Sequence, residues 1–255
     1  MNKFIRLIAV AVMGVAVTGC ANVNNMAFDH ASTTLDTKVK SIVLLTVDVS
    51  RSDGSRWVPE PKIAKFEKLG ATNNEGLQNF RLDKRIDATQ VDDKSIYLVR
   101  VALAPGQYKF QEIFGMASAF PVHGFFDIPV GADLNVKPNS VTYIGRITAK
   151  LRKRVGNEFR AGPVAPLIDQ AIAGMSNGTW DISIDDLAQQ DLAFFRESFP
   201  VLRYAVIDTV ALPAFDRAAA QRRWDGDKQE TAPVATEASA ATAPDTKAAA
   251  QKSPD

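Results

Sequence analysis

The sequence predicts a mainly β, α+β fold: an antiparallel β-sandwich with a C-terminal amphipathic helix packed on it and disordered tails. Two observations support this prediction. Between residues 41 and 149, short segments alternate apolar and polar side chains, and turn-forming residues separate these segments. After residue 185 the apolar residues recur at helical spacing instead. Many short strands joined by turns are typical of two packed antiparallel sheets.

The first twenty residues have the pattern of an export signal. Lys3 and Arg6 precede an apolar run over residues 7–17, and the chain's only cysteine, Cys20, follows two small residues. A membrane span needs about 20 apolar residues, so this run is too short to be one. A charged start, a short apolar segment and a small-residue cleavage site predict that residues 1–19 are a signal peptide.

Val17-Thr18-Gly19-Cys20 resembles the lipobox of bacterial lipoproteins. The resemblance implies cleavage between Gly19 and Cys20, a diacylglycerol thioether on the Cys20 sulfur and an acyl chain on the new N-terminus. Several acyl chains anchor a protein firmly, because each buried CH₂ contributes about 0.8 kcal/mol. Ala21 is not the aspartate that retains such proteins in the inner membrane. The resemblance therefore implies an outer-membrane anchor and a periplasmic domain, with surface exposure left open.

Residues 20–40 form the link between this anchor and the folded domain. They are polar and lack a sustained period, which predicts a lipidated tether. The alternative is a fixed N-terminal arm in which Met26 and Phe28 pack onto the domain. The sequence favours neither.

The folded domain is expected over residues 41–212, beginning with a strand at 41–50. That segment is β-branched and apolar on both faces, which predicts a central strand. A turn follows at 51–55. Pro59 and Pro61 then impose an extended entry, and residues 63–69 fit one or two helical turns. Residues 78–82 predict a weak edge strand.

The clearest sequence signal for a hairpin comes next. Alternation over residues 97–103 is followed by Ala104-Pro105-Gly106, and the alternation resumes at Tyr108 and Phe110. Proline presets φ and glycine supplies positive φ, so the turn has a physical basis. Further strands are expected at 122–128, where Pro129 and Gly131 end the pattern, and at 141–149.

Two of these segments carry a second resemblance. Leu103-Ala104-Pro105-Gly106-Gln107-Tyr108 and Val141-Thr142-Tyr143-Ile144-Gly145-Arg146-Ile147 resemble prealbumin-type and carboxypeptidase-regulatory-type β-sandwiches. The chain looks still more like uncharacterised envelope lipoproteins built on such domains. The resemblance covers residues 41–149 and implies a Greek-key sandwich that binds or spaces. It brings no catalytic residues.

A basic run ends the predicted sheet. Four cations fall within five residues: Lys150, Arg152, Lys153 and Arg154. One interpretation is contact with anionic lipid headgroups, lipopolysaccharide or peptidoglycan, since each cation near a charged membrane contributes about 1 kcal/mol. The other is a solvated turn.

The rest of the chain predicts two helices, two strands and a tail. A short helix fits residues 166–173 and a strand fits 180–184. Ser183 with Asp186 fits a capping box for an amphipathic helix over about 185–199. A last strand is expected within 204–212. Residues 213–255 are expected to be mostly disordered, because beyond Trp224 they lack the apolar residues that would offset ordering entropy.

Two patterns suggest catalysis. Residues 174–178 read G-x-S-x-G around Ser176, but a nucleophile elbow needs a helix after the serine and a later histidine. Both histidines, His30 and His123, precede Ser176, which favours a tight turn. His123 and Asp127 lie four apart in a predicted strand and so share a face. They fit a base with its orienting carboxylate, or a structural pair.

The remaining candidates point to structure. Asp92-Asp93 is expected in a loop, Asp185-Asp186 in the first turn of a helix, and Asp225-Gly226-Asp227 is too short for a calcium loop. Two histidines do not make a multi-histidine zinc site. The aromatic residues Phe120, Phe125 and Phe126 fit either a ligand groove or a core. A net charge of +1 argues against nucleic acid as a partner.

The sequence thus predicts a non-enzymatic lipoprotein, anchored in the outer membrane, that acts as a binding or structural module of the cell envelope. No cofactor or metal is expected besides the covalent lipid on Cys20. The expected partners are the membrane and an envelope protein, peptidoglycan or lipopolysaccharide. The alternatives are a periplasmic hydrolase of an envelope polymer, using carboxylates or Ser176, and a small-ligand or metal-binding lipoprotein.

Overall fold

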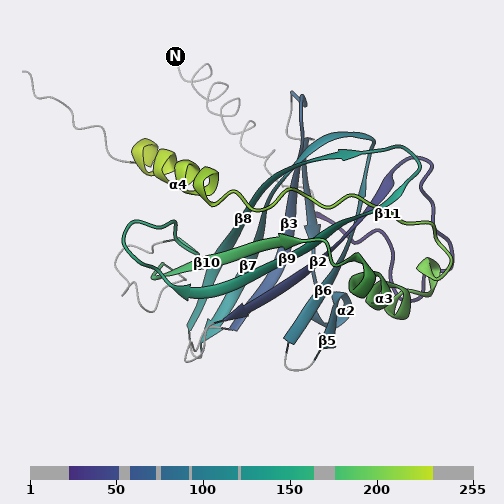
Figure 1. Cartoon of the computed structure of the whole chain (residues 1–255), viewed down its shortest axis with the longest axis horizontal. Coiled ribbons are helices and arrows are strands. Elements are labelled where there is room, and N and C mark those ends of the chain that lie inside the picture. Colours follow the sequence, from purple (N-terminus) through teal and green to yellow (C-terminus); the bar gives the residue numbers. More distant parts are fainter. Residues whose placement is uncertain are drawn as a thin grey trace, which may run out of the picture.

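The computed structural model describes residues 23–51, 58–72, 76–91, 94–119, 122–163 and 176–231. They form two mixed β-sheets and a few helices (Figure 1). Sheet A has the strand order β1-β4-β3-β7-β8, and sheet B has the order β10-β9-β2-β6-β5. The strands are β1 (Val23–Asn24), β2 (Ser41–Arg51), β3 (Val58–Lys68), β4 (Leu77–Arg81), β5 (Ala88–Val91), β6 (Lys94–Leu103), β7 (Gly106–Ala119), β8 (Val122–Val136), β9 (Val141–Lys153), β10 (Gly178–Asp185) and β11 (Asp208–Thr209).

The helical segments are α2 (Lys84–Asp87), α3 (Ala188–Ser198), the 3₁₀ turn η2 (Pro200–Leu202) and α4 (Arg217–Thr231). Figure 1 shows α3 and α4 at opposite ends of the molecule. Neighbouring strands are mostly antiparallel, but β2 pairs with β9 in parallel, as do β1 with β4 and β11 with β9. The prediction of mainly β structure is confirmed, whereas the expectation of purely antiparallel sheets is wrong.

Strand β2 is the central strand that the sequence predicts. It lies between β9 and β6. Leu45 on one face is buried in the apolar core that the two sheets share, and Leu44 on the other face is buried in a second apolar layer. A strand needs apolar residues on both faces only when both faces are covered, and here they are.

The predicted hairpin at Ala104-Pro105-Gly106 is wrong. Strand β6 belongs to sheet B and β7 to sheet A, so the turn carries the chain from one sheet to the other. Gly106 has φ 145°, which suits glycine. Val99 and Phe110 both enter the shared core, from opposite sides. Alternation marked the buried face of each strand correctly, but it carries no information on which strand is the partner.

Several strands are longer than the sequence suggested, among them β3 and β8. Of residues 63–69, interpreted as helical turns, residues 63–68 belong to β3, and Pro59 and Pro61 lie in the first half of that strand. Strand β4 pairs only with Ile63–Glu67, so the stretch of β3 that holds the prolines has a strand partner, β7, on one side only. Strand β8 continues through Pro129 and Gly131, because the β7–β8 register shifts there and accommodates the break as a bulge.

The N-terminal arm, residues 23–35, packs against the rest of the protein and is not a free tether. Val23 and Asn24 pair with β4. The Ala27 N–H donates to the Arg100 carbonyl (2.8 Å), in the place along β6 that β5 leaves vacant when it ends opposite Tyr97. Phe28 is buried. Of the two interpretations of this segment, the structure shows the fixed arm.

The second apolar layer covers the outer face of sheet B. It joins Phe28 of the arm to Phe195 of α3 and to Phe199, which follows α3. Helix α3 lies within the predicted helix and covers the sheet as its amphipathic pattern implies. The predicted capping box is wrong, because Ser183 donates to Asp185 (2.7 Å) and Asp186 accepts from the Ala188 N–H (3.1 Å).

The C-terminal part is more ordered than expected. The expectation of disorder from residue 213 onward is wrong for α4, because Ala220 is buried and Trp224 packs against the shared core. A polar helix can be held by a few such contacts even where its composition is unfavourable. The expected strand within 204–212 shrinks to β11. Residues 1–22, with the signal peptide and Cys20, the expected helix at 166–173 and residues 232–255 lie outside the described residues.

Candidate functional site

The serine of the G-x-S-x-G pattern is fully buried. Its carbonyl accepts a hydrogen bond from Arg160 Nη1, and the chain enters strand β10 two residues later, at Gly178. A nucleophile elbow instead exposes its serine ahead of a helix. The local structure around Ser176 is therefore that of a turn entering a strand.

His123 and Asp127 lie on the same outer face of sheet A, as predicted, but make no hydrogen bond to each other. The His123 ring is exposed, and its Nδ1 lies 2.8 Å from Ser118 Oγ. Burial raises the pKa of Asp127 to about 6, helped by the charge of Glu112 and opposed by that of Lys65. Each side chain has its own surroundings, and the base-and-carboxylate interpretation lacks its defining contact.

The other sequence candidates have structural surroundings. Phe126 is buried against Trp180 (ring centroids 5.2 Å), whereas Phe125 is 54% exposed and stacks on Phe114 (5.6 Å). Asp225 accepts from Gln221 (3.2 Å) within α4. Phe120, the Asp92-Asp93 pair and the side chain of Asp227 lie outside the described residues.

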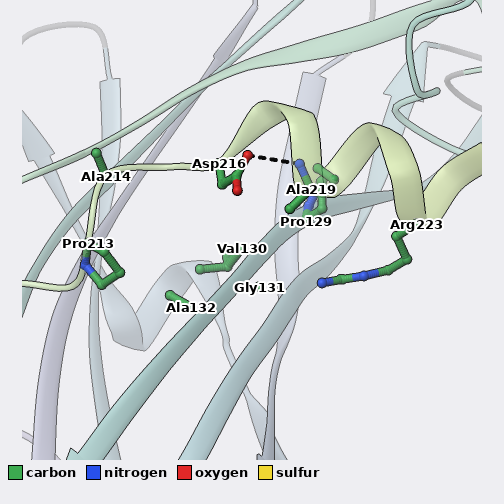
Figure 2. A pocket seen from close by; sticks show the side chains of 10 residues that line it. Pro129, Val130, Gly131, Ala132, Pro213, Ala214, Asp216, Ala219 and Arg223 are labelled. Carbon is green, nitrogen blue, oxygen red and sulfur yellow. Dashed lines mark hydrogen bonds between the residues drawn. The ribbon is translucent and has the colours of Figure 1, made fainter.

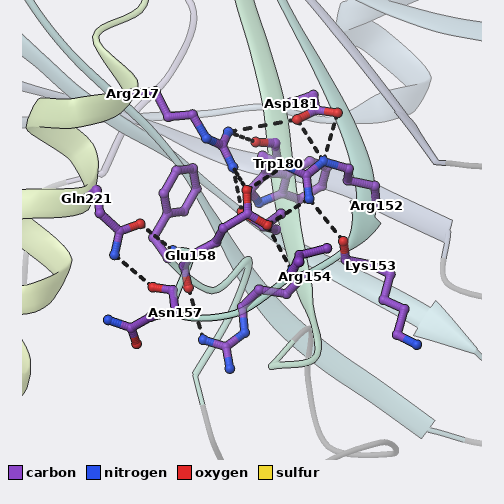
Figure 3. A network of polar contacts seen from close by, with 12 residues as sticks. Arg152, Lys153, Arg154, Asn157, Glu158, Trp180, Asp181, Arg217 and Gln221 are labelled. Carbon is purple, nitrogen blue, oxygen red and sulfur yellow. Dashed lines mark hydrogen bonds and ion pairs between the residues drawn. The ribbon is translucent and has the colours of Figure 1, made fainter.

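The basic run forms part of an ion-pair network at one lateral edge of the molecule. Arg152 donates to both oxygens of Glu158 (2.8 and 2.6 Å) and to Asp181 (2.8 Å). Arg217 of α4 donates to the same Glu158 (2.7 Å), and Figure 3 shows both guanidinium groups converging on this carboxylate. These hydrogen bonds raise the pKa of Arg152 and lower that of Glu158.

The four cations of the run therefore have different roles. The Arg152 side chain is bound by the protein's own carboxylates, and Arg154 Nη1 donates to the Glu158 carbonyl (2.9 Å). Lys150 and Lys153 are exposed, and the described part of the chain gives their side chains no ion-pair partner. The network joins β9, β10, the segment after β9 and α4. We call this region, together with β8, the β9/β10 edge.

A cavity of about 360 Å³ lies between β8 and α4 (Figure 2). Its walls are mostly apolar, with the backbone of Gly131 beneath the Arg223 guanidinium, where a Cβ atom would lie 2.9 Å from Nη2. Asp216 accepts from the Ala219 N–H (2.8 Å) and caps α4. The carboxylate at this cavity thus serves the start of α4, and the Arg223 guanidinium lies close to the backbone of β8.

The opposite lateral edge, which we call the β1/β4 edge, consists of β1, β4 and α2. The connection through α2 joins β4, which lies next to the edge strand β1 of sheet A, to β5, the outermost strand of sheet B. On the other side, the Asp127 N–H of β8 donates to the Ala161 carbonyl in the segment after β9 (2.9 Å). The β1/β4 edge and the β9/β10 edge therefore lie on opposite sides of the shared core.

A buried arginine attaches the arm to the β1/β4 edge. Arg100 is fully buried; its Nη2 donates to Asp87 Oδ1 (2.7 Å) and its Nε to the Phe28 carbonyl (3.0 Å). Burial lowers the pKa of this guanidinium, and Asp87 opposes the shift. The guanidinium also stacks on Phe199, with its Cζ 4.1 Å from the ring centroid. A buried pair of this kind fixes geometry because neither partner can lose the other cheaply.

His30 adds a second attachment of the arm. Its Nδ1 lies 2.7 Å from the Ser198 carbonyl oxygen, and its Nε2 lies 2.9 Å from the Ile86 carbonyl oxygen. The ring stacks on Phe199 (4.7 Å between centroids). The arm is thus fastened to both α2 and the end of α3.

Another buried ion pair lies on the face under α3. Asp191 accepts hydrogen bonds from Arg146 and from the Tyr143 hydroxyl. Gly145, with φ 113°, bulges β9, so that Tyr143 and Arg146 both lie on the outer face although they are three residues apart. Burial raises the pKa of Tyr143, and Asp191 adds to that rise. This cluster holds α3 on sheet B.

The β1/β4 edge also carries a groove with a volume of about 680 Å³. Four cations and two carboxylates line it: Lys62, Arg81, Lys84, Arg85, Glu60 and Asp83. Lys62 pairs with Glu60, and Arg85 with Asp83 (3.4 Å). Arg81 and Lys84 are exposed and have no ion-pair or hydrogen-bond partner among the residues described. Sequence reasoning missed this groove, although three of its cations fall within residues 81–85.

Within the described ranges, no helix is both long and apolar enough to cross a membrane, and no group of three or more His, Cys, Asp or Glu residues is placed to hold a metal ion. The chain matches no protein-family model, no curated protein and no solved structure. The interpretation of its function therefore depends on its own residues.

Proposed function

We propose that the chain is a non-enzymatic lipoprotein, anchored in the outer membrane through lipid on Cys20, whose periplasmic body serves as a binding or structural module of the cell envelope. The lipobox Val17-Thr18-Gly19-Cys20 carries this proposal. The fixed arm supports it, because an anchor that begins three residues before Val23 would hold the body close to the bilayer and in a defined orientation.

A Greek-key β-sandwich related to prealbumin-like domains is the fold we propose for this module. The chain alternates between the sheets at the β2–β3, β4–β5, β6–β7 and β8–β9 connections. Such crossings are the connections that a sandwich of two sheets requires. The parallel β2–β9 pair is the feature that any relative would have to share.

Intact mass and fractionation test the anchor. We expect the mature chain to begin at Cys20, with a mass increased by a diacylglycerol and one further acyl chain, and to sediment with the outer membrane on a density gradient. The Cys20→Ala variant should lose the lipid and this distribution. An unmodified N-terminus at or near Cys20 in the native protein would refute the proposal.

Single substitutions test the non-enzymatic part. The observations that support it are the burial of Ser176 and the missing contact between His123 and Asp127. A deletion strain should regain a normal envelope when it expresses the Ser176→Ala, His123→Ala or Asp127→Asn variant. The recovery should be as complete as with the native chain. Loss of complementation in a variant that is present at native levels would favour a hydrolase instead.

A further inference from the structure

The arm determines which side of the body would face the membrane. This inference rests on the lipid anchor proposed above. Asn24 Nδ2 donates to Gln78 Oε1 and to the Asn79 carbonyl (both 3.3 Å), so the chain is fixed to β4 from its first described residues. Two residues separate Cys20 from Val23, and the three Cα-to-Cα steps between them span at most about 11 Å. The bilayer surface must therefore lie next to the β1/β4 edge.

The basic run on the β9/β10 edge is too far away to share that contact. In sheet B, three interstrand spacings of about 4.8 Å, or about 14 Å in all, separate β9, which carries the run, from β5, which follows α2 of the β1/β4 edge. Arg152 in addition is held by Glu158 and Asp181. When the β1/β4 edge faces the bilayer, the run faces away from it.

The groove on the β1/β4 edge has the charge that a phospholipid phosphate requires. Its cations exceed its carboxylates by two, and the two cations left without partners are Arg81 and Lys84. A guanidinium binds phosphate oxygens in a bidentate manner, and an ammonium adds a mobile point charge. A phosphate bound between the two unpartnered cations would neutralise them, as Glu60 and Asp83 neutralise Lys62 and Arg85.

Exposed apolar side chains accompany these cations. Val23 is 53% exposed, Leu77 44% and Ile86 47%, in β1, β4 and α2 respectively. Apolar side chains beside lysine and arginine suit the boundary between headgroups and acyl chains, where each group contacts its preferred surroundings. The composition of this edge thus agrees with the position that the anchor would give it.

We propose that the groove lined by Lys62, Arg81, Lys84 and Arg85 binds the headgroup phosphate of an anionic phospholipid in the leaflet that holds the anchor. The lipid on Cys20 supplies attachment, and the groove sets orientation. The body therefore stands on the membrane with the β1/β4 edge down and the β9/β10 edge free to meet partners.

The experiment uses the lipidated chain in vesicles of phosphatidylcholine, with and without phosphatidylglycerol. Because Cys20 is the only cysteine and carries the lipid, Leu77→Cys or Val155→Cys introduces a single free thiol for an environment-sensitive fluorophore. Val155, 71% exposed and in the segment after β9, is the matched site on the opposite edge. Phosphatidylglycerol should move the fluorophore at residue 77 into a less polar environment and leave that at residue 155 unchanged.

Charge-neutralising variants identify the groove. Arg81→Gln/Lys84→Gln should shift the ratio of docked to undocked molecules about thirtyfold toward the undocked form, from about 1 kcal/mol for each cation. Lys150→Gln/Lys153→Gln, which removes two exposed cations from the β9/β10 edge, should leave the ratio unchanged. None of these four side chains has an ion-pair partner in the described ranges, so circular dichroism should show no loss of fold.

Three outcomes would overturn the proposal: no dependence on phosphatidylglycerol at residue 77, an equal response of both double variants, or the same response to inorganic phosphate in phosphatidylcholine vesicles. The mass of the purified chain is measured first. A chain without lipid refutes the anchor, whereas a lipidated chain that fails the fluorescence test refutes the groove alone.

Discussion

The two lateral edges of the body both concentrate cations, but they use them differently. At the β9/β10 edge, Arg152 and Arg217 converge on Glu158 and are neutralised by it, whereas Lys150 and Lys153 stay exposed without an ion-pair partner among the described residues. At the β1/β4 edge, Arg81 and Lys84 have no partner within the described part of the chain and lie beside exposed apolar side chains. The comparison teaches that the density of charge along a sequence is a poor guide to a binding surface, because neighbouring carboxylates decide which cations are available.

The largest effect is expected from removing Arg100, the buried cation next to the β1/β4 edge. Arg100→Met leaves the Asp87 carboxylate buried without its partner, and we expect the free energy of unfolding to fall by about 3–5 kcal/mol. Urea denaturation followed by circular dichroism measures this. Arg100→Met/Asp87→Leu should lose less than the two single variants added together. A loss below about 1 kcal/mol in Arg100→Met would show that the arm is not held as the structure indicates.

The second test concerns Asp127. Its backbone N–H donates a hydrogen bond to the Ala161 carbonyl in the segment after β9. Its pKa is raised from 3.8 to about 6, so its favourable contribution is complete below pH 3.8 and is lost as the pH rises through 6. Asp127→Asn should therefore be more stable than the native chain at pH 7, by about 1–2 kcal/mol after allowance for partial exposure. Paired urea titrations should show this advantage vanish by about pH 4. An equal difference at both pH values would refute the raised pKa.

The third test opens the network of the β9/β10 edge. Glu158→Gln frees Arg152 and Arg217, and because the network is partly exposed we expect a loss of only about 1 kcal/mol at low salt. Added salt should reduce the difference, since screening weakens the native pairs. The lowered pKa of Glu158 means that its contribution is present above its ordinary pKa and is lost in acid. A loss that is independent of salt would point to packing instead.

The smallest effect is expected from the exposed lysines of the basic run. Lys150→Gln and Lys153→Gln should each change the free energy of unfolding by less than about 0.5 kcal/mol, because neither side chain has a partner among the residues that the structure describes. Differential scanning fluorimetry at two salt concentrations provides the measurement. A larger change would mean that these lysines belong to the network after all.

Much of the fold was predictable where periodicity alone decides the outcome. Val43, Leu45 and Val47 marked the inner face of β2, and the spacing of Phe195 and Phe199 located α3. The hairpin at Pro105 failed because alternation is the same whether the next strand joins the same sheet or the facing one. The helical interpretation of residues 63–69 failed because strand pairing outweighed a local pattern that fits either structure.

The groove was beyond sequence reasoning for a related reason. Arg81, Lys84 and Arg85 are close in sequence, but Lys62 and Val23 reach them only through the pairing of β1, β3 and β4. Conversely, the run at residues 150–154 looked available because Glu158 and Asp181 approach Arg152 only in the folded chain. Attachment of the arm by Arg100 likewise needed the position of β6 to be known.

The arm that fills the open side of β6 has a consequence for shortened forms of the chain. Cutting at Ser41, where the regular alternation starts, would strip residues 26–28 from β6 and uncover Leu98 and Tyr143. An unpaired strand edge next to newly exposed aliphatic and aromatic side chains favours strand pairing between molecules. Such a fragment should self-associate in solution, while one that starts at Val23 stays monodisperse.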